Sequence, residues 1–192
     1  MIETLIADIS KTISLSDADK ACLTENFKVK KLRKKQYFLQ EGDIAFHTAY
    51  IAKGCLKTFT VDSEGSEHIY QIAIEGWWTA DIYSFLTGEP AIYNIEAVED
   101  SELLITDKVG RERIFERVPK FERFMRILIE KNVVANQHRL NSMMMLSAEE
   151  RYLSFIKKYP QIVQRVPQHM IASYLGIKPE TLSRIRKQLI SD

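Results

Sequence analysis

One stretch near the end of the chain, residues 168–189 (QHMIASYLGIKPETLSRIRKQL), limits the possible folds more than any other. A small residue, Ala172, stands where two helices would cross closely, and Gly176 stands where a tight inter-helix turn often needs a positive φ. Pro179 follows, and proline is favoured at the first position of a helix. The positions that a helix-turn-helix buries are apolar: Ile171, Leu175, Ile177, Leu182 and Ile185. The stretch therefore predicts a helix-turn-helix whose second helix begins near Pro179.

The predicted second helix has two distinct faces. At about 100° per residue, the apolar side chains of Leu182, Ile185 and Leu189 fall on one side. The opposite side carries polar groups that can pair with base edges and phosphates, as a helix in the major groove must. The candidate DNA-binding residues are Glu180, Thr181, Ser183, Arg184 and Lys187. A solvated amphipathic helix would share this polar face, but the matching positions before it favour the DNA-binding motif.

The distribution of charge agrees with this assignment. The 192-residue chain has a net charge of +1, which alone gives no nucleic-acid signal. Residues 147–192 hold 8 Lys or Arg against 4 Asp or Glu, whereas residues 1–146 carry a net charge of −3. The positive field therefore lies on the segment where attraction to phosphates would be used.

The middle of the chain has the texture of short strands. Its turn signals recur every 11 or 12 residues, at Gly42, Gly54, Gly65 and Gly76. Such spacing is typical of an antiparallel sandwich or barrel, so residues 37–106 predict a roll of about eight strands. Helical patterns over residues 2–13 and 16–27 predict two helices that cover the roll. The basic run 28–35 suits a lysine-guarded edge strand, with contact to DNA or polymerase as the alternative.

An aromatic cluster follows Gly76 and continues to Phe85. It is as typical of a protein core, or of the underside of a helix, as of a ligand-binding site. As a binding site, it would combine with the turn that follows. The candidate effector pocket consists of Trp77, Trp78, Tyr83, Ala91 and Ile92.

Residues 120–146 contain neither Gly nor Pro and predict one long helix. Five of its residues alternate by 4 and 3: Ile129, Val133, Asn136, Leu140 and Met143. This spacing is typical of a coiled-coil seam, in which one Asn often fixes register and pairing, and it predicts a homodimer. The alternative is that this face packs on the sheet of its own chain. A second apolar stripe, Phe121, Phe124 and Leu128, suits packing against the roll.

The segment Ser147-Ala148-Glu149-Glu150 has the form of a capping box, with serine at the N-cap and glutamate three residues later. A new helix therefore begins here, and Ser147 is the predicted hinge. The chain is expected to be an α+β protein in three parts. These are an antiparallel, jelly-roll-like β-roll (1–118), a dimerisation helix (119–146) and a helix-turn-helix domain (147–192).

In this order of parts, the chain resembles the Crp/Fnr family of bacterial transcription regulators over essentially its whole length. Its most specific segment, residues 180–184 (ETLSR), is similar to the Glu-Thr-x-Ser-Arg of Fnr-type recognition helices. The resemblance implies that Glu180, Ser183 and Arg184 read bases, in a half-site containing TGA, while Thr181 contacts a phosphate. It also implies a homodimer on pseudo-palindromic double-stranded DNA, RNA polymerase as a partner, and a cyclic-nucleotide-binding-like roll that answers to a small-molecule effector.

Three departures from the family pattern bear on this expectation. Members that bind cyclic nucleotides grip the phosphate with an Arg followed by Ser or Thr, whereas Pro90-Ala91-Ile92-Tyr93 stands at that place here. Because no Arg or Lys lies between Lys57 and Lys108, we expect no binding of cAMP or cGMP in the usual way. The cysteine cluster of the iron–sulfur oxygen sensors is absent, since the N-terminal region has only Cys22. No wing strands are expected after Leu189.

Two other readings compete with an effector-controlled regulator. A cupin-like enzyme would need closely spaced His and Glu ligands on adjacent strands, but His68 stands alone in its strand. The scattered histidines (His47, His68, His138 and His169) and two cysteines predict no metal, no cofactor and no enzyme activity. Alternatively, the roll is a purely structural platform without a ligand. With no apolar run of membrane-spanning length and no signal-peptide pattern, we expect a cytoplasmic protein.

Overall fold

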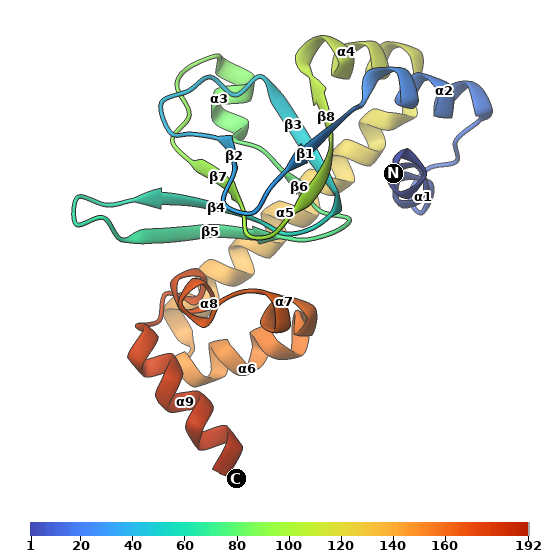
Figure 1. The fold of residues 1–192 in the computed structure, drawn as a ribbon. Helices are drawn as coiled ribbons and strands as arrows, with labels where there is room; N and C mark the ends of the chain where they lie inside the picture. The colour runs from blue at the N-terminus through green and yellow to red at the C-terminus, as the bar shows by residue number, and fades with distance from the viewer. Residues whose placement is uncertain (192) are drawn as a thin grey trace.

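The structure, a computed structural model, describes residues 1–191, with side chains placed as far as Leu189. An N-terminal β-roll, one long helix and a C-terminal group of short helices follow one another along the chain (Figure 1). Mixed helices and antiparallel strands make this an α+β fold, as predicted. Among the described residues, no helix is both long and apolar enough to cross a membrane.

The roll consists of two four-stranded antiparallel sheets, and the described strands number eight, as the glycine spacing predicts. One sheet has the order β1-β8-β3-β6 and the other β2-β7-β4-β5. The strands are β1 (Lys28–Leu32), β2 (Tyr37–Leu39), β3 (His47–Lys53), β4 (Leu56–Val61), β5 (Glu67–Ala73), β6 (Trp78–Thr79), β7 (Asn94–Ala97) and β8 (Ser101–Asp107). The core between the sheets includes Ile51, Leu56, Ile95 and Leu103.

The spaced glycines form the turns of this roll. All four of Gly42, Gly54, Gly65 and Gly76 have φ between 81° and 105°, a region that other residues rarely adopt. Gly54 is required for a second reason, because an added Cβ would lie 2.2 Å from Ser101 Oγ. The basic run also behaves as predicted, since β1 is an edge strand of its sheet.

The N-terminal helices cover one side of the roll. They are α1 (Ile2–Ser10) and α2 (Asp17–Asn26), and α2 begins with a capping box at Ser16. A second core forms where these helices meet the roll, α4 (Lys108–Arg117) and the start of α5 (Lys120–Met145). Its fully buried members include Leu5, Leu23, Tyr50 and Phe121. The prediction of two covering helices is confirmed.

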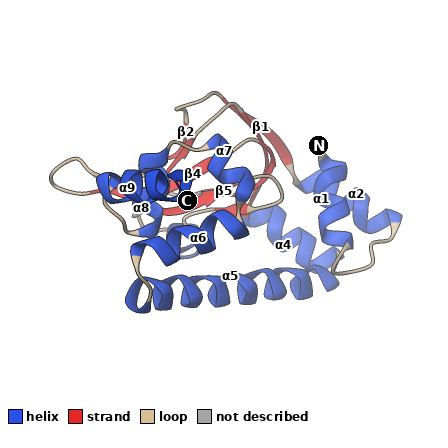
Figure 2. Ribbon diagram, turned by 90° about the horizontal axis from the view of Figure 1, so that it is seen from below, coloured by secondary structure: helices blue, strands red, loops and turns tan. Residues whose placement is uncertain are grey.

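The long helix α5 joins the two halves of the molecule. Its 26 residues span about 39 Å, and Figure 2 shows it extended along one side of the structure. Phe121 and Phe124 are buried against the roll, so the predicted packing stripe is confirmed. Four helices follow α5: α6 (Ala148–Lys158), α7 (Pro160–Arg165), α8 (Gln168–Leu175) and α9 (Pro179–Ser191). A third core joins them to strands β4 and β5.

Candidate nucleic-acid interface

The C-terminal helices begin at the predicted capping box. Ser147 Oγ accepts from Glu150 N–H at 3.2 Å, and the Glu150 carboxylate accepts from Ser147 N–H at 2.8 Å. The hydrogen bond from Ser147 N–H favours the ionised carboxylate and lowers the pKa of Glu150. α5 ends at Met145 and α6 begins at Ala148. Ser147 therefore lies between these two helices, where the hinge is predicted.

The turn between α8 and α9 depends on Gly176. This residue has φ 64° and ψ 40°, the left-handed conformation that the sequence pattern predicts. Ile177 N–H then donates to the Ala172 carbonyl at 2.9 Å, closing the end of α8. Ala172 is fully buried, and its small side chain allows α8 and α9 to approach closely.

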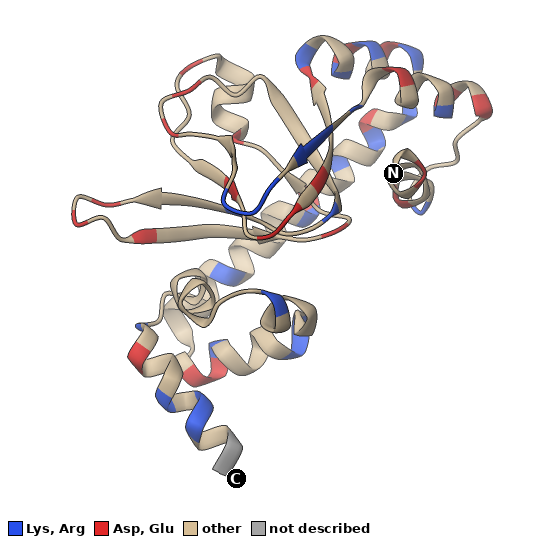
Figure 3. Ribbon diagram, in the orientation of Figure 1, with Lys and Arg blue, Asp and Glu red and all other residues tan. Residues whose placement is uncertain are grey.

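One face of α9 packs inward and the other is exposed. Leu182 and Ile185 are buried together with Ile171, Leu175 and Ile177, as predicted. Of the polar residues, Glu180, Ser183, Arg184 and Lys187 are exposed and Thr181 is partly exposed. The helix extends to the end of the molecule farthest from the roll, and Figure 3 shows basic residues along it.

The two charged groups at the start of this face have no ion-pair partner in the part of the chain that the structure describes. Glu180 and Arg184 lie one helical turn apart, yet within the described residues neither makes an ion pair. An exposed guanidinium offers a bidentate fork to a guanine, and an exposed carboxylate can accept from a cytosine amino group. The arrangement therefore fits direct readout of bases in a major groove.

The predicted seam on α5 divides into two groups. Ile129, Val133 and Leu140 are 50–61% exposed, which is unusual for large apolar side chains. Asn136 Nδ2 instead donates to Tyr70 Oη at 3.1 Å within the same chain. Met143 lies against the turn at Gly176. All five seam residues are exposed, and Asn136 and Met143 also have contacts within their own chain.

The helix-turn-helix group is held against the roll by a charged cluster that sequence patterns did not reveal. Arg165 on α7 donates from Nη1 and Nη2 to the Glu75 carboxylate at 2.7 and 2.9 Å and also pairs with Glu99. Burial opposes ionisation of Glu75, but hydrogen bonds from Arg165 and from Gly54 N–H outweigh it and lower its pKa to about 2. Because 90 residues separate Arg165 from Glu75, no local motif marks the pair.

Strand β5 forms the other part of this contact. Ser173 Oγ on α8 accepts from Ile69 N–H at 2.9 Å and donates to the Glu67 carbonyl at 2.8 Å. Arg139 on α5 donates to the carbonyls of Ile69, at 3.3 Å, and Tyr70. Since β5 is an edge strand, these side chains occupy backbone groups that a further strand would otherwise bind.

The turn that is expected to hold a cyclic phosphate in relatives is hydrogen-bonded here to the buried carboxylate of Asp81. Asp81 is 1% exposed and caps α3 (Ile82–Thr87) by accepting from Ser84 N–H. Its second oxygen accepts from the N–H groups of Ile92 and Tyr93 at 2.9 and 3.2 Å. Backbone donors at this turn are therefore already bound to an anion. The sequence signal was an Asp three residues before a Ser, and it was missed.

The structure does not bring the five candidate pocket residues together. Trp77 faces Tyr159 of the helical group, with ring centroids 5.5 Å apart, whereas the Trp78 ring packs against Phe27 and Tyr50. Adjacent residues of an extended chain point in opposite directions, which explains the separation. Of the remaining three, Ala91 is buried, while Tyr83 and Ile92 are about half exposed on the surface. Trp77 and Trp78 both border one cavity, between the roll and the helical group, which Tyr83, Ala91 and Ile92 do not line.

No metal site emerges from the described part of the chain, where no group of three His, Cys, Asp or Glu side chains is placed to hold an ion. His68 is exposed and bonds to Asp62 at 2.6 Å in the β4–β5 hairpin. Both cysteines are buried and free, and burial raises the pKa of the Cys55 thiol to about 12. Such a thiol stays protonated and is a poor ligand or nucleophile.

A β-roll that a long helix joins to a helix-turn-helix group is the architecture of a two-domain transcription regulator. Residues 29–118 match the cyclic nucleotide-binding domain family. The chain is 23% identical over 173 residues to the regulatory protein HlyX of Actinobacillus pleuropneumoniae, a match that covers 81% of this chain and 69% of HlyX. In sequence and in fold, the chain is therefore similar to the Crp/Fnr family of transcription regulators.

Solved structures of distant relatives share this fold. FixK2 of Bradyrhizobium japonicum superposes with a TM-score of 0.75 at 17% identity, covering 86% of this chain and 85% of FixK2. The global regulator CLP of Xanthomonas campestris gives a TM-score of 0.73 at 13% identity, covering 92% of this chain and 93% of CLP.

Proposed function

We propose that this regulator binds double-stranded DNA as a homodimer and reads bases with Glu180, Ser183 and Arg184, while Thr181 and Lys187 contact the backbone. The observation that carries the proposal is the exposed polar face of α9, with Glu180 and Arg184 unpaired within the described chain and Leu182 and Ile185 buried behind them. An exposed polar face that is held in place by a buried apolar face suits a recognition helix. Such a protein acts in the cytoplasm, with RNA polymerase as a partner.

The homodimer forms through α5 in this proposal. Ile129, Val133 and Leu140 form an exposed apolar stripe on the part of α5 that follows Phe124, and a second copy of the stripe would cover it. Two-fold symmetry would then present two α9 helices to successive major grooves about 34 Å apart. Asn136 and Met143 lie beside the stripe and contact their own chain, so we assign them a supporting role in fixing the helix.

Fluorescence anisotropy with labelled duplexes tests DNA binding. The probe is a 30-base-pair duplex with two inverted TGA-containing half-sites, and the matched control has the same composition with both half-sites scrambled. We expect the specific duplex to bind at least a hundredfold more tightly at 150 mM salt. Equal affinity for the two duplexes would remove the assignment of α9 as a base reader for this half-site. A random-sequence selection then establishes whether α9 reads a different one.

The roll, in this proposal, does not bind cAMP or cGMP in the usual family manner. A cyclic phosphate carries a full negative charge and needs a cation or free N–H donors to offset its lost hydration. At the corresponding turn, Ala91 and Ile92 supply no charge, and the N–H groups of Ile92 and Tyr93 already donate to Asp81. The Asp81 carboxylate would also repel the incoming phosphate.

Titration calorimetry with cAMP and with cGMP on the purified protein checks this expectation. We expect no heat from binding at this turn, so that any heat measured up to about 1 mM is the same for the unmodified protein and for Ala91→Trp. The Asp81→Asn variant serves as a matched comparison, since it removes the repelling charge and keeps the shape. Micromolar binding by the unmodified protein, lost on Ala91→Trp, would contradict the assignment.

A further inference from the structure

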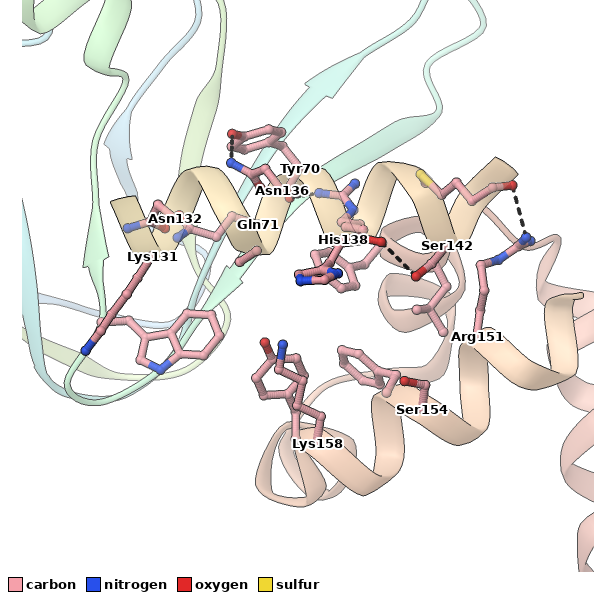
Figure 4. Close-up of a pocket in the computed structure, with 18 of the residues that line it drawn as sticks. Tyr70, Gln71, Lys131, Asn132, Asn136, His138, Ser142, Arg151, Ser154 and Lys158 are labelled. Atoms are coloured by element: carbon pink, nitrogen blue, oxygen red, sulfur yellow. Dashed lines mark hydrogen bonds between the residues drawn. The ribbon is translucent and has the colours of Figure 1, made fainter. Parts of the chain in front are cut away.

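A cavity of about 500 Å³ lies where α5, α6 and the start of β6 meet (Figure 4). Its walls come from both halves of the molecule: Trp77 from the roll, His138 from the long helix, and Lys158 from the helix-turn-helix group. Cavities of about 300–1,000 Å³ are typical of small-molecule sites. The cavity is separate from the turn at Asp81, which contributes no residue to it.

The charge of this cavity has one sign. Four cationic side chains, Lys131, Arg139, Arg151 and Lys158, line it together with His138, and no carboxylate does. None of the four cations forms an ion pair with another described residue. A concave site lined by unbalanced positive charge focuses the field on anions.

Two of these cations also keep buried donors without a partner. The Nε atoms of Arg139 and Arg151 are buried, and neither finds a hydrogen-bond acceptor in the described chain. The remaining donors of both guanidinium groups are held by backbone carbonyls, such as Leu146 O at 2.8 Å from Arg151 Nη1. Neutral carbonyls fix these groups but leave their charge uncompensated.

The rest of the wall is aromatic. Trp77 meets Tyr159 edge-on at 5.5 Å, and Phe155 lies 5.5 Å from both Tyr159 and Tyr174. The cations lie over these rings, with Arg139 4.4 Å from the Tyr174 centroid and Lys158 5.2 Å from the Tyr159 centroid. Aromatic faces beside cations suit a ligand that has both a flat ring and a negative group.

The side of α5 that lines most of the cavity differs from the side that carries Val133 and Leu140. At about 100° per residue, the cavity-facing positions Ala135, His138 and Ser142 lie about 180–240° from Ile129, on the side of α5 away from Val133 and Leu140. Figure 4 shows side chains of α5 and α6 extending into the same space. Asn136 and Met143 of the seam also line the cavity, so its α5 wall borders the predicted dimer interface.

We propose that this junction cavity binds a small anionic molecule with a planar aromatic ring. The ring lies among Trp77, Phe155 and Tyr159, and the anionic group lies near Arg139, Lys131 and Lys158. Because both halves of the molecule supply the walls, a bound ligand favours the docked arrangement over any in which the helical group moves away. The effect of this bias on DNA binding rests on the proposed function, but ligand binding itself does not.

A pair of probes that differ only in charge tests the site. 1-Anilinonaphthalene-8-sulfonate carries a flat ring system and one sulfonate, and 1-anilinonaphthalene is the same molecule without the anion. We expect the sulfonate probe to bind one site per chain at least tenfold more tightly than the neutral probe, with quenching of Trp77 emission. Lys131→Met/Lys158→Met, which changes two exposed side chains, should weaken only the sulfonate probe, by tenfold or more.

Controls separate binding from folding and from DNA recognition. Arg123→Met alters an exposed cation on α5 outside the cavity and should change neither affinity. Circular dichroism of each variant verifies folding, and DNA affinity measured on the same samples reports separately on α9. Equal affinity of the two probes, or sulfonate affinity unchanged in both the lysine double variant and Arg139→Met, overturns the proposal. Loss of the sulfonate preference in either variant with folding intact supports it.

Discussion

Arg184 is exposed, and it makes no ion pair with the residues the structure describes. Its neighbour Ile185 is buried, so the backbone beneath the guanidinium is fixed. We predict that Arg184→Ala lowers affinity for the specific duplex by about 1–3 kcal/mol and relaxes the preference at one base pair in each half-site. Fluorescence anisotropy with a set of singly substituted duplexes measures both effects.

A matched control for this prediction is Arg113→Ala. Arg113 is an exposed arginine on α4, far along the chain from the helix-turn-helix, and its loss removes the same charge. It should leave the specificity ratio unchanged. If Arg184→Ala weakens specific and random duplexes equally, Arg184 contacts phosphate only and does not read a base.

Glu75 gives the chain an acid-sensitive contact between its two halves. Its pKa of about 2 lies below the usual 4.5, so the ionised carboxylate favours the folded state fully above pH 4.5. This contribution is lost as the pH falls from about 4.5 to 2. Because the side chain is 40% exposed, solvent screening reduces the effect to about 0.5–1 kcal/mol between pH 6 and 3.5. Urea unfolding of wild type and Glu75→Gln at both values measures it, with wild type losing more.

The corresponding control is Glu116→Gln, which removes an exposed carboxylate on α4. It should follow the wild-type pH dependence. A Glu75→Gln variant that also follows the wild-type curve would show that the contact with Arg165 and Gly54 does not favour the folded state.

At the scale of elements, the exposed stripe on α5 is the feature with the clearest consequence. We predict that Val133→Glu/Leu140→Glu yields a monomer, because two charges per chain would be buried in the seam without partners. Sedimentation equilibrium at micromolar concentration measures the mass. Arg123→Glu/Asn141→Glu introduces the same two residues about 120° around the helix and should leave the dimer intact. If the Val133→Glu/Leu140→Glu variant has the wild-type mass, the dimer interface does not include this stripe.

Helix boundaries were predictable because their causes are local. The caps at Ser16 and Ser147, the left-handed turn at Gly176 and the start of α9 at Pro179 all depend on residues within one helical turn. The glycine spacing likewise revealed the roll, since each positive φ belongs to a single turn. Periodicity on α5 identified an apolar stripe, but it could not reveal that Asn136 bonds to Tyr70 of the roll.

The contacts that sequence patterns missed join distant segments. Ser173 and Glu67 are 106 residues apart, and no spacing rule links a serine on a helix to an edge strand. The different directions of the Trp77 and Trp78 rings were not predicted for another reason. Trp77 and Trp78 are adjacent in sequence, but the alternation of an extended segment directs their rings into different cores.

At the scale of the whole molecule, one ion-pair cluster ties the helix-turn-helix group to the roll. We predict that Arg165→Met speeds hydrogen exchange of the Ile69 amide, whose acceptor is Ser173 across the contact, by about tenfold. The variant leaves Glu75 and Glu99 facing each other without a cation, so the contact opens more often. NMR-detected exchange measures the rate residue by residue.

Amides within β3 provide the internal reference, since this strand lies inside the other sheet. Their exchange should change little, and Arg113→Met should leave the Ile69 amide as in wild type. Equal acceleration throughout the roll would indicate global destabilisation, and an unchanged Ile69 rate would show that Arg165 does not control the contact.

The position of α8 over β5 has a consequence for solubility. An uncovered edge strand is a template for pairing with another chain, and proteins ordinarily blunt such edges with charges, bulges or covering elements. Here Ser173 and Arg139 occupy the free backbone groups of residues 67–70. Separation of the helical group from the roll therefore uncovers a self-complementary edge. The docked arrangement, through Ser173, therefore protects this edge from pairing with the strand of a second chain.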